Sequence, residues 1–144
     1  MNQYITRLFE SDEAIENQEI DKAEVAKAVS EIDGMRWLDD DDSSDFIEVF
    51  FKEQSGSGID GVWETVFEFN PEGIAFPGRA NPDPDGPEWT AARRLSEHLQ
   101  AYILDEESNI YHPVTAALSV TEKELEDNGL PSLQNLPDRN ATNR

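Results

Sequence analysis

The strongest constraint on this chain is its excess of negative charge. Asp and Glu number 32 against 11 Lys and Arg in 144 residues, so the formal net charge is −21 at pH 7. Self-repulsion of this size opposes compaction. Leu, Ile, Val and Phe supply 33 residues, just above the level of about 20% below which highly charged chains stay unfolded. We therefore expect one small core in a single domain over residues 1–129, followed by an extended or disordered tail over residues 130–144.

The composition also excludes several classes of protein. The chain contains no Cys, which excludes disulfides, a thiolate nucleophile and Cys-ligated metals, and we expect a cytoplasmic location. No apolar run approaches the roughly 18 residues of a membrane span. Because nucleic acids and anionic lipids are bound through Lys and Arg, we expect neither direct nucleic-acid binding nor membrane binding.

Two segments carry clear helix signals. Asp21 can cap a helix over residues 21–33, because Glu24 completes a capping box and Gly34 follows as a stop. Pro87 suits the first turn of a second helix, which the apolar spacing extends from Glu88 to Glu107.

Weaker signals indicate short helices near both ends of the chain. Tyr4, Ile5, Leu8 and Phe9 recur at helical spacing, and a second capping box opens a brief helix over residues 121–129. Both are expected to be minor parts of the fold.

Three segments between the main helices read as strands. Residues 45–53 and 61–70 are rich in β-branched and aromatic residues, and a tight turn leads from the second into residues 74–76. Strict alternation places Trp63 on the same face as Phe67, so Trp63 is expected in the core, as is Trp89. The sequence predicts an α+β fold: a three- to four-stranded antiparallel sheet with the two main helices packed on one face.

The most conspicuous candidate site is a run of four aspartates before the first of these strands. Three interpretations are open: a solvated loop, an acidic surface that faces a partner, or a metal site. Residues 1–72 carry a net charge of −15 and residues 73–144 only −6, which favours a dedicated acidic face. Trp37 is either a core residue or an anchor for a partner. The predicted partner-binding residues are Trp37, Asp39, Asp40, Asp41, Asp42, Asp45, Asp60, Glu64 and Glu68.

Two further patterns offer little chemistry. Residues 81–86 match the first half of a calcium-binding loop, but Ala92 stands where the bidentate Glu belongs, so no metal or cofactor is expected. The only imidazoles are His98, expected to face solvent, and His112, expected to serve a turn before Pro113. With no catalytic motif near either, we expect no enzyme.

These observations favour a small acidic protein that inhibits or sequesters a basic protein, such as a nuclease, a toxin or a nucleic-acid-binding protein. Immunity proteins and nucleic-acid mimics include acidic proteins of this size. Because the comparison rests on charge and size alone, it is an analogy only. The alternative is a housekeeping or ligand-binding domain from a halotolerant organism, in which the acidity serves solvation and no dedicated acidic site exists.

The charge excess predicts that salt stabilises the fold. Ions screen repulsion over about 8 to 10 Å near physiological ionic strength, so the urea midpoint should rise between 10 mM and 1 M KCl. An unchanged midpoint would show that the carboxylates are too dispersed to oppose folding.

Overall fold

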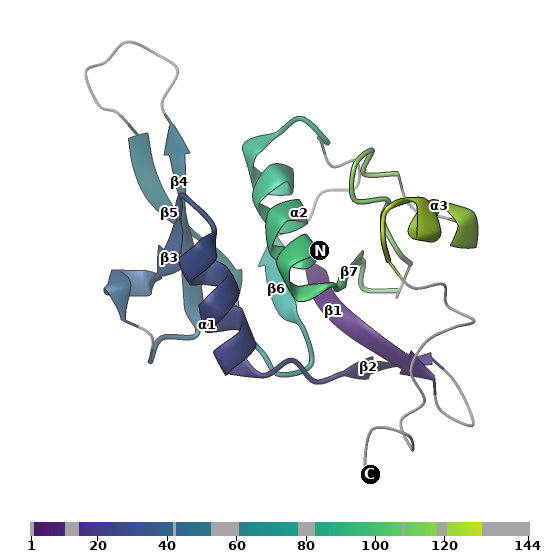
Figure 1. Cartoon of the computed structure of the whole chain (residues 1–144). Helices are drawn as coiled ribbons and strands as arrows, with labels where there is room; N and C mark the ends of the chain where they lie inside the picture. The colour runs from purple at the N-terminus through teal and green to yellow at the C-terminus, as the bar shows by residue number, and fades with distance from the viewer. Residues whose placement is uncertain are drawn as a thin grey trace.

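The structure is a computed structural model of the chain, and it describes residues 2–10, 15–41, 43–52, 61–77, 83–107, 109–117 and 121–130. These residues form a mostly β architecture with short helices (Figure 1). In chain order the elements are β1 (Asn2–Glu10), β2 (Ile15–Gln18), α1 (Lys22–Glu31), β3 (Met35–Trp37), the 3-10 turn η1 (Leu38–Asp40), β4 (Phe46–Lys52), β5 (Gly61–Glu68), β6 (Ile74–Pro77), α2 (Pro87–Leu99), β7 (Tyr102–Leu104) and α3 (Glu122–Asp127).

The strands form one antiparallel sheet in the order β2-β1-β6-β5-β4-β3, and β7 pairs with β1 off this path. The prediction of a three- to four-stranded sheet with two main helices packed on it is therefore wrong, because the sheet has seven strands and the helices are short. The predicted meander is present as β4, β5 and β6, but it makes up only the middle of a larger sheet.

The largest error concerns residues 2–10, which form strand β1 instead of the predicted N-terminal helix. This strand is covered on both faces: Ile5 belongs to the main core, whereas Thr6 and Leu8 are buried on the other side. Burial of both faces removes the alternation of apolar and polar residues by which a strand is recognised. The remaining pattern of apolar residues resembles helical spacing.

The second main helix is also shorter than predicted. It ends at Leu99, and Gln100 follows in the left-handed conformation with φ 51°. Residues 102–104 then pair with β1 as β7. A consecutive apolar run such as residues 101–104 fits a strand buried on both faces as well as it fits a helix. The other predicted helices are confirmed as α1, capped by the Asp21 side chain, and α3, capped by Thr121.

A β-bulge in strand β5 reverses the predicted faces of the sheet. Ile47 pairs with Phe67, but the next residue, Glu48, pairs with Thr65, so Val66 is the extra residue. Directly paired residues share a face, which places Phe67 on one face and Thr65 and Trp63 on the other. Trp63 is consequently half-buried outside the core, and the prediction that it lies with Phe67 is wrong.

The core lies between the sheet and the two longer helices. Side chains of α1 and α2 pack with Ile5, Ile47, Phe67 and Ile74 of the sheet in one cluster, and Figure 1 shows both helices on the same side of the sheet. Trp89 is buried in this cluster as predicted, and its Nε1 donates a hydrogen bond to the carbonyl of Pro113 at 2.8 Å.

A second, smaller cluster covers the other face of β1 and β7. It consists of Leu8, Tyr102, Leu104, Ile110 and Leu125, the last of which comes from α3. Burial raises the pKa of the Tyr102 phenol to about 12. Within the described residues, no helix is long and apolar enough to cross a membrane.

The second cluster predicts a large effect of truncating Leu125, which is only 1% exposed. Leu125→Ala should lower the free energy of unfolding by about 2 to 4 kcal/mol, because it removes buried methyl groups and leaves a cavity. Urea denaturation measures the change. Val114→Ala is the control, since Val114 is 47% exposed and should cost under about 0.5 kcal/mol. Equal effects of the two substitutions would mean that α3 does not pack as described.

Candidate functional site: an acidic cleft on the sheet

The predicted partner-binding residues have separate structural roles and do not form one patch. Trp37 is buried in the main core, where the Lys22 ammonium lies 5.3 Å from its ring centroid. Asp45 forms an ion pair with the same Lys22 at 3.1 Å. Asp41 accepts hydrogen bonds from the backbone N–H and the hydroxyl of Ser43, and these bonds lower its pKa. Trp37 is thus a core residue, and only part of the predicted set is free of internal contacts.

The remaining predicted residues do not extend one surface. Asp39 is exposed in η1 with φ 55°. Glu64 and Glu68 are both exposed, but the bulge between them places them on opposite faces of β5, since Glu64 pairs with Val49 and Glu68 with Phe46. Asp42, Asp60 and the side chain of Asp40 lie outside the described residues. The binding role of this set stays a prediction.

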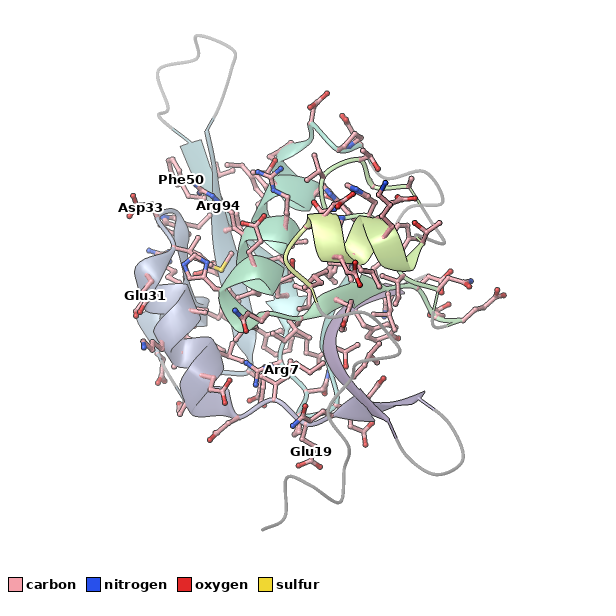
Figure 2. The ribbon with its side chains drawn as sticks, turned by 45° about the vertical axis from the view of Figure 1, so that its right-hand side comes forward. Arg7, Glu19, Glu31, Asp33, Phe50 and Arg94 are labelled. Atoms are coloured by element: carbon pink, nitrogen blue, oxygen red, sulfur yellow. The ribbon has the colours of Figure 1, made fainter. Side chains whose placement is uncertain are left out.

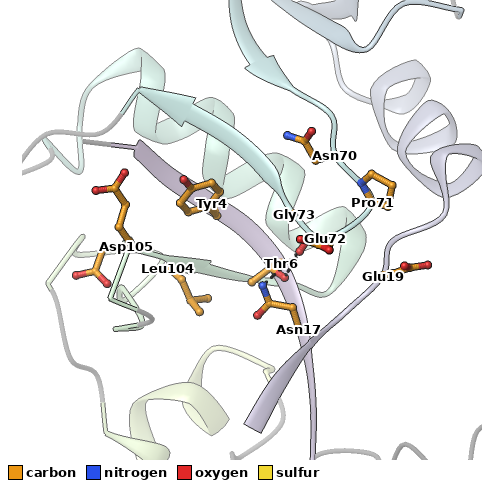
Figure 3. A pocket seen from close by; sticks show the side chains of 11 residues that line it. Tyr4, Thr6, Asn17, Glu19, Asn70, Pro71, Glu72, Gly73, Leu104 and Asp105 are labelled. Atoms are coloured by element: carbon orange, nitrogen blue, oxygen red, sulfur yellow. Dashed lines mark hydrogen bonds between the residues drawn. The ribbon is translucent and has the colours of Figure 1, made fainter.

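The structure instead brings other carboxylates together around a cleft of about 650 Å³ on the face of β1 opposite Ile5 (Figure 3). We call it the acidic cleft. Acidic and amide side chains dominate its lining, and none of the described residues that line it is basic. These residues are Tyr4, Thr6, Asn17, Glu19, Asn70, Pro71, Glu72, Gly73, Leu104, Asp105 and Glu106.

The cleft floor is the outward face of β1. Figure 3 shows Tyr4 and Thr6 on this strand beside the turn that contains Glu72. The Thr6 hydroxyl donates a hydrogen bond to the carbonyl of Glu72 at 2.9 Å, which fixes the turn against the strand. Gly73 permits this approach, because a Cβ there would lie 3.4 Å from both the Ile5 carbonyl oxygen and the Thr6 Cβ. The turn therefore forms a fixed wall of the cleft.

The opposite wall is the loop after β7. The Asp105 carboxylate accepts hydrogen bonds from the backbone N–H groups of Glu107 and Asn109 at 2.9 and 2.8 Å, so Asp105 shapes its own loop. Glu106 Oε1 accepts a hydrogen bond from the N–H of Asn2 at 3.3 Å. This loop thereby holds two carboxylates beside the end of β1.

Two carboxylates of the cleft are available for a ligand. Glu19 and Glu72 make no side-chain hydrogen bond or ion pair within the described part of the chain. Carboxylates in a concave site attract a cation, and Tyr4 adds an aromatic ring to the lining of the same cleft. The arrangement is suited to binding a guanidinium or an ammonium group.

Both histidines make local contacts with their own segments. His98 is exposed as predicted, and its Nδ1 lies 3.0 Å from the carbonyl of Arg94. His112 serves its turn as predicted, since its Nδ1 accepts hydrogen bonds from the N–H groups of Val114 and Thr115, both at 3.1 Å. Among the described residues, no group of three or more His, Asp and Glu side chains is placed to hold a metal ion.

Comparison of the chain with protein-family models, with curated protein sequences and with solved structures finds no match. The site must therefore be interpreted from its own geometry. Sequence reasoning missed the cleft because its four carboxylates come from three separate segments: the β2–α1 link, the β5–β6 turn and the loop after β7. The loop after β7 does contain the acidic run Asp105-Glu106-Glu107, but Glu19 and Glu72 stand outside any such run.

Proposed function

We propose that this protein binds and thereby inhibits or sequesters a basic protein, such as a nuclease, a toxin or a nucleic-acid-binding protein. The observation that carries the proposal is the acidic cleft, which collects Glu19, Glu72, Asp105 and Glu106 around one concave site without a basic residue among its described lining. A lysine or arginine side chain of the partner would enter this cleft.

The charge of the whole chain and the geometry of the cleft both contribute to binding of a basic partner, but they act at different distances. A net charge of −21 attracts a cationic surface over about a Debye length and speeds association. The same charge repels phosphates, so direct binding of nucleic acid or of an anionic membrane is not part of the proposal. Close to the surface, Glu19 and Glu72 supply carboxylates that have no side-chain partner among the described residues. Together they favour a basic polypeptide over other ligands.

One observation supports the alternative, a domain whose acidity serves solvation in a halotolerant organism. Exposed carboxylates occur outside the cleft as well, for example Glu31 and Asp33 at the end of α1 and Asp85 before α2, which lines a separate hollow together with Asp33. Figure 2 shows Glu31 and Asp33 at the end of α1 remote from Glu19. These carboxylates provide a control set with which the two functions can be separated.

The proposal predicts that neutralising the cleft weakens binding of a cationic peptide more than the loss of charge alone would. Fluorescence anisotropy with a short labelled peptide of alternating Arg and Gly measures Kd at low salt. The combined variant Glu19→Gln, Glu72→Gln and Glu106→Gln should bind about tenfold more weakly, because it removes the ligating carboxylates.

The matched control is Glu31→Gln, Asp33→Asn and Asp85→Asn, which changes the net charge by the same amount. Its Kd should stay within about threefold of the unmodified protein, since only long-range attraction is reduced. Equal weakening by both variants would favour general solvation and contradict a dedicated cleft.

A further inference from the structure

A row of aromatic side chains lies on the face of the sheet that α1 and α2 leave uncovered. The register places Phe46, Glu48 and Phe50 of β4 on this face, together with Arg36 of β3 and Trp63 of β5. Phe46 is 40% exposed, and Phe50 and Trp63 are half-buried. We call Phe46, Phe50 and Trp63 the aromatic row.

The charged side chains beside the aromatic row contact one another and the rings of the row. The Arg36 guanidinium carbon lies 4.0 Å from the centroid of Trp63, and Arg36 Nε is 3.1 Å from Glu48 Oε1. Phe50 contacts the same indole, with ring centroids 5.4 Å apart. Among the described side chains of β3 to β6, Arg36 is the only cation, and Glu48 neutralises it. Among the side chains that the structure describes, this surface therefore presents apolar rings and one neutralised cation.

The aromatic row is continuous with the acidic cleft. Phe46 pairs with Glu68, Glu68 with Ala75, and Ala75 with Tyr4 of the cleft floor. Directly paired residues share a face of the sheet, so one uninterrupted cross-strand line joins the exposed ring of Phe46 to the cleft. The exposed carboxylate of Glu68 lies in the middle of this line.

We propose that this uncovered face is one binding surface, on which the aromatic row docks apolar side chains of a basic polypeptide while a neighbouring cationic side chain enters the acidic cleft. The inference rests on the proposed function, which supplies the positive charge of the partner. It adds a second feature that the protein recognises in the partner, an apolar residue next to the cationic one. Exposed aromatic rings beside a charged border are typical of the residues that dominate binding energy at interfaces.

Charge complementarity selects this occupant among the alternatives. Stacked bases of a single-stranded nucleic acid would also fit an aromatic sheet face, but their phosphates would meet Glu68 and the cleft carboxylates. A second copy of the chain would bring another charge of −21 to the same surface. A basic polypeptide is the occupant that gains from both the rings and the carboxylates.

Two synthetic peptides test the inference: one alternates Arg with Gly, and the other, of equal length and charge, alternates Arg with Leu. The unmodified protein should bind the Leu peptide about tenfold more tightly, because leucine side chains are buried on the aromatic row. Phe46→Thr should reduce this preference to about threefold or less. Val62→Thr is the control, since Val62 is 45% exposed and pairs with Phe51 on the other face of the hairpin; it should leave the preference unchanged.

Tryptophan emission provides a second measurement that needs no variant. Trp37 and Trp89 are buried, whereas Trp63 is only half-buried, so the Leu peptide should shift the emission of Trp63 to shorter wavelength. Equal affinity for the two peptides, or the same preference in Phe46→Thr, would overturn the aromatic row while leaving the cleft intact. Failure of both peptides to bind would instead overturn the proposed function, and tighter binding of an oligothymidylate than of the Leu peptide would show that the face takes a nucleic acid.

Discussion

The two-sided burial of β1 is the constraint on which the rest of the structure depends. This strand pairs with β2, β6 and β7, and one of its faces supplies Ile5 to the main core. Its other face holds Leu8 in the second cluster and forms the floor of the acidic cleft with Tyr4 and Thr6. A chain with so few large apolar residues thus buries side chains on both faces of one strand, and the candidate site is built on this strand.

The position of the two longer helices determines where binding can occur. Because α1 and α2 pack on one face of the sheet, the aromatic row and Glu68 lie on the opposite face of strands β3 to β6. The acidic cleft borders this face, and Glu48 pairs with Arg36, the one cation among the described side chains of β3 to β6. The position of the helices and the distribution of charge therefore favour binding of a basic partner at the same surface.

Local signals in the sequence identify several elements but not the site. Capping residues Asp21 and Thr121 correctly place α1 and α3, and composition places β4, β5 and β6. The strand β1 escapes prediction because burial of both faces hides its alternation. The faces of β5 depend on the bulge at Val66, which only the pairing with β4 reveals. The cleft needs the long-range contact of three segments, and no local pattern specifies such a contact.

The most direct test of whether the uncovered face of the sheet is the binding surface is a titration with the peptide that alternates Arg with Leu. The quantities to measure are the amide chemical shifts of the protein. The account predicts perturbations that cluster at Tyr4, Thr6, Gly73 and Phe46 and at the indole N–H of Trp63, with little change along α1. Perturbations concentrated at the aspartates between Asp39 and Asp45, or spread evenly over the exposed carboxylates, would contradict it.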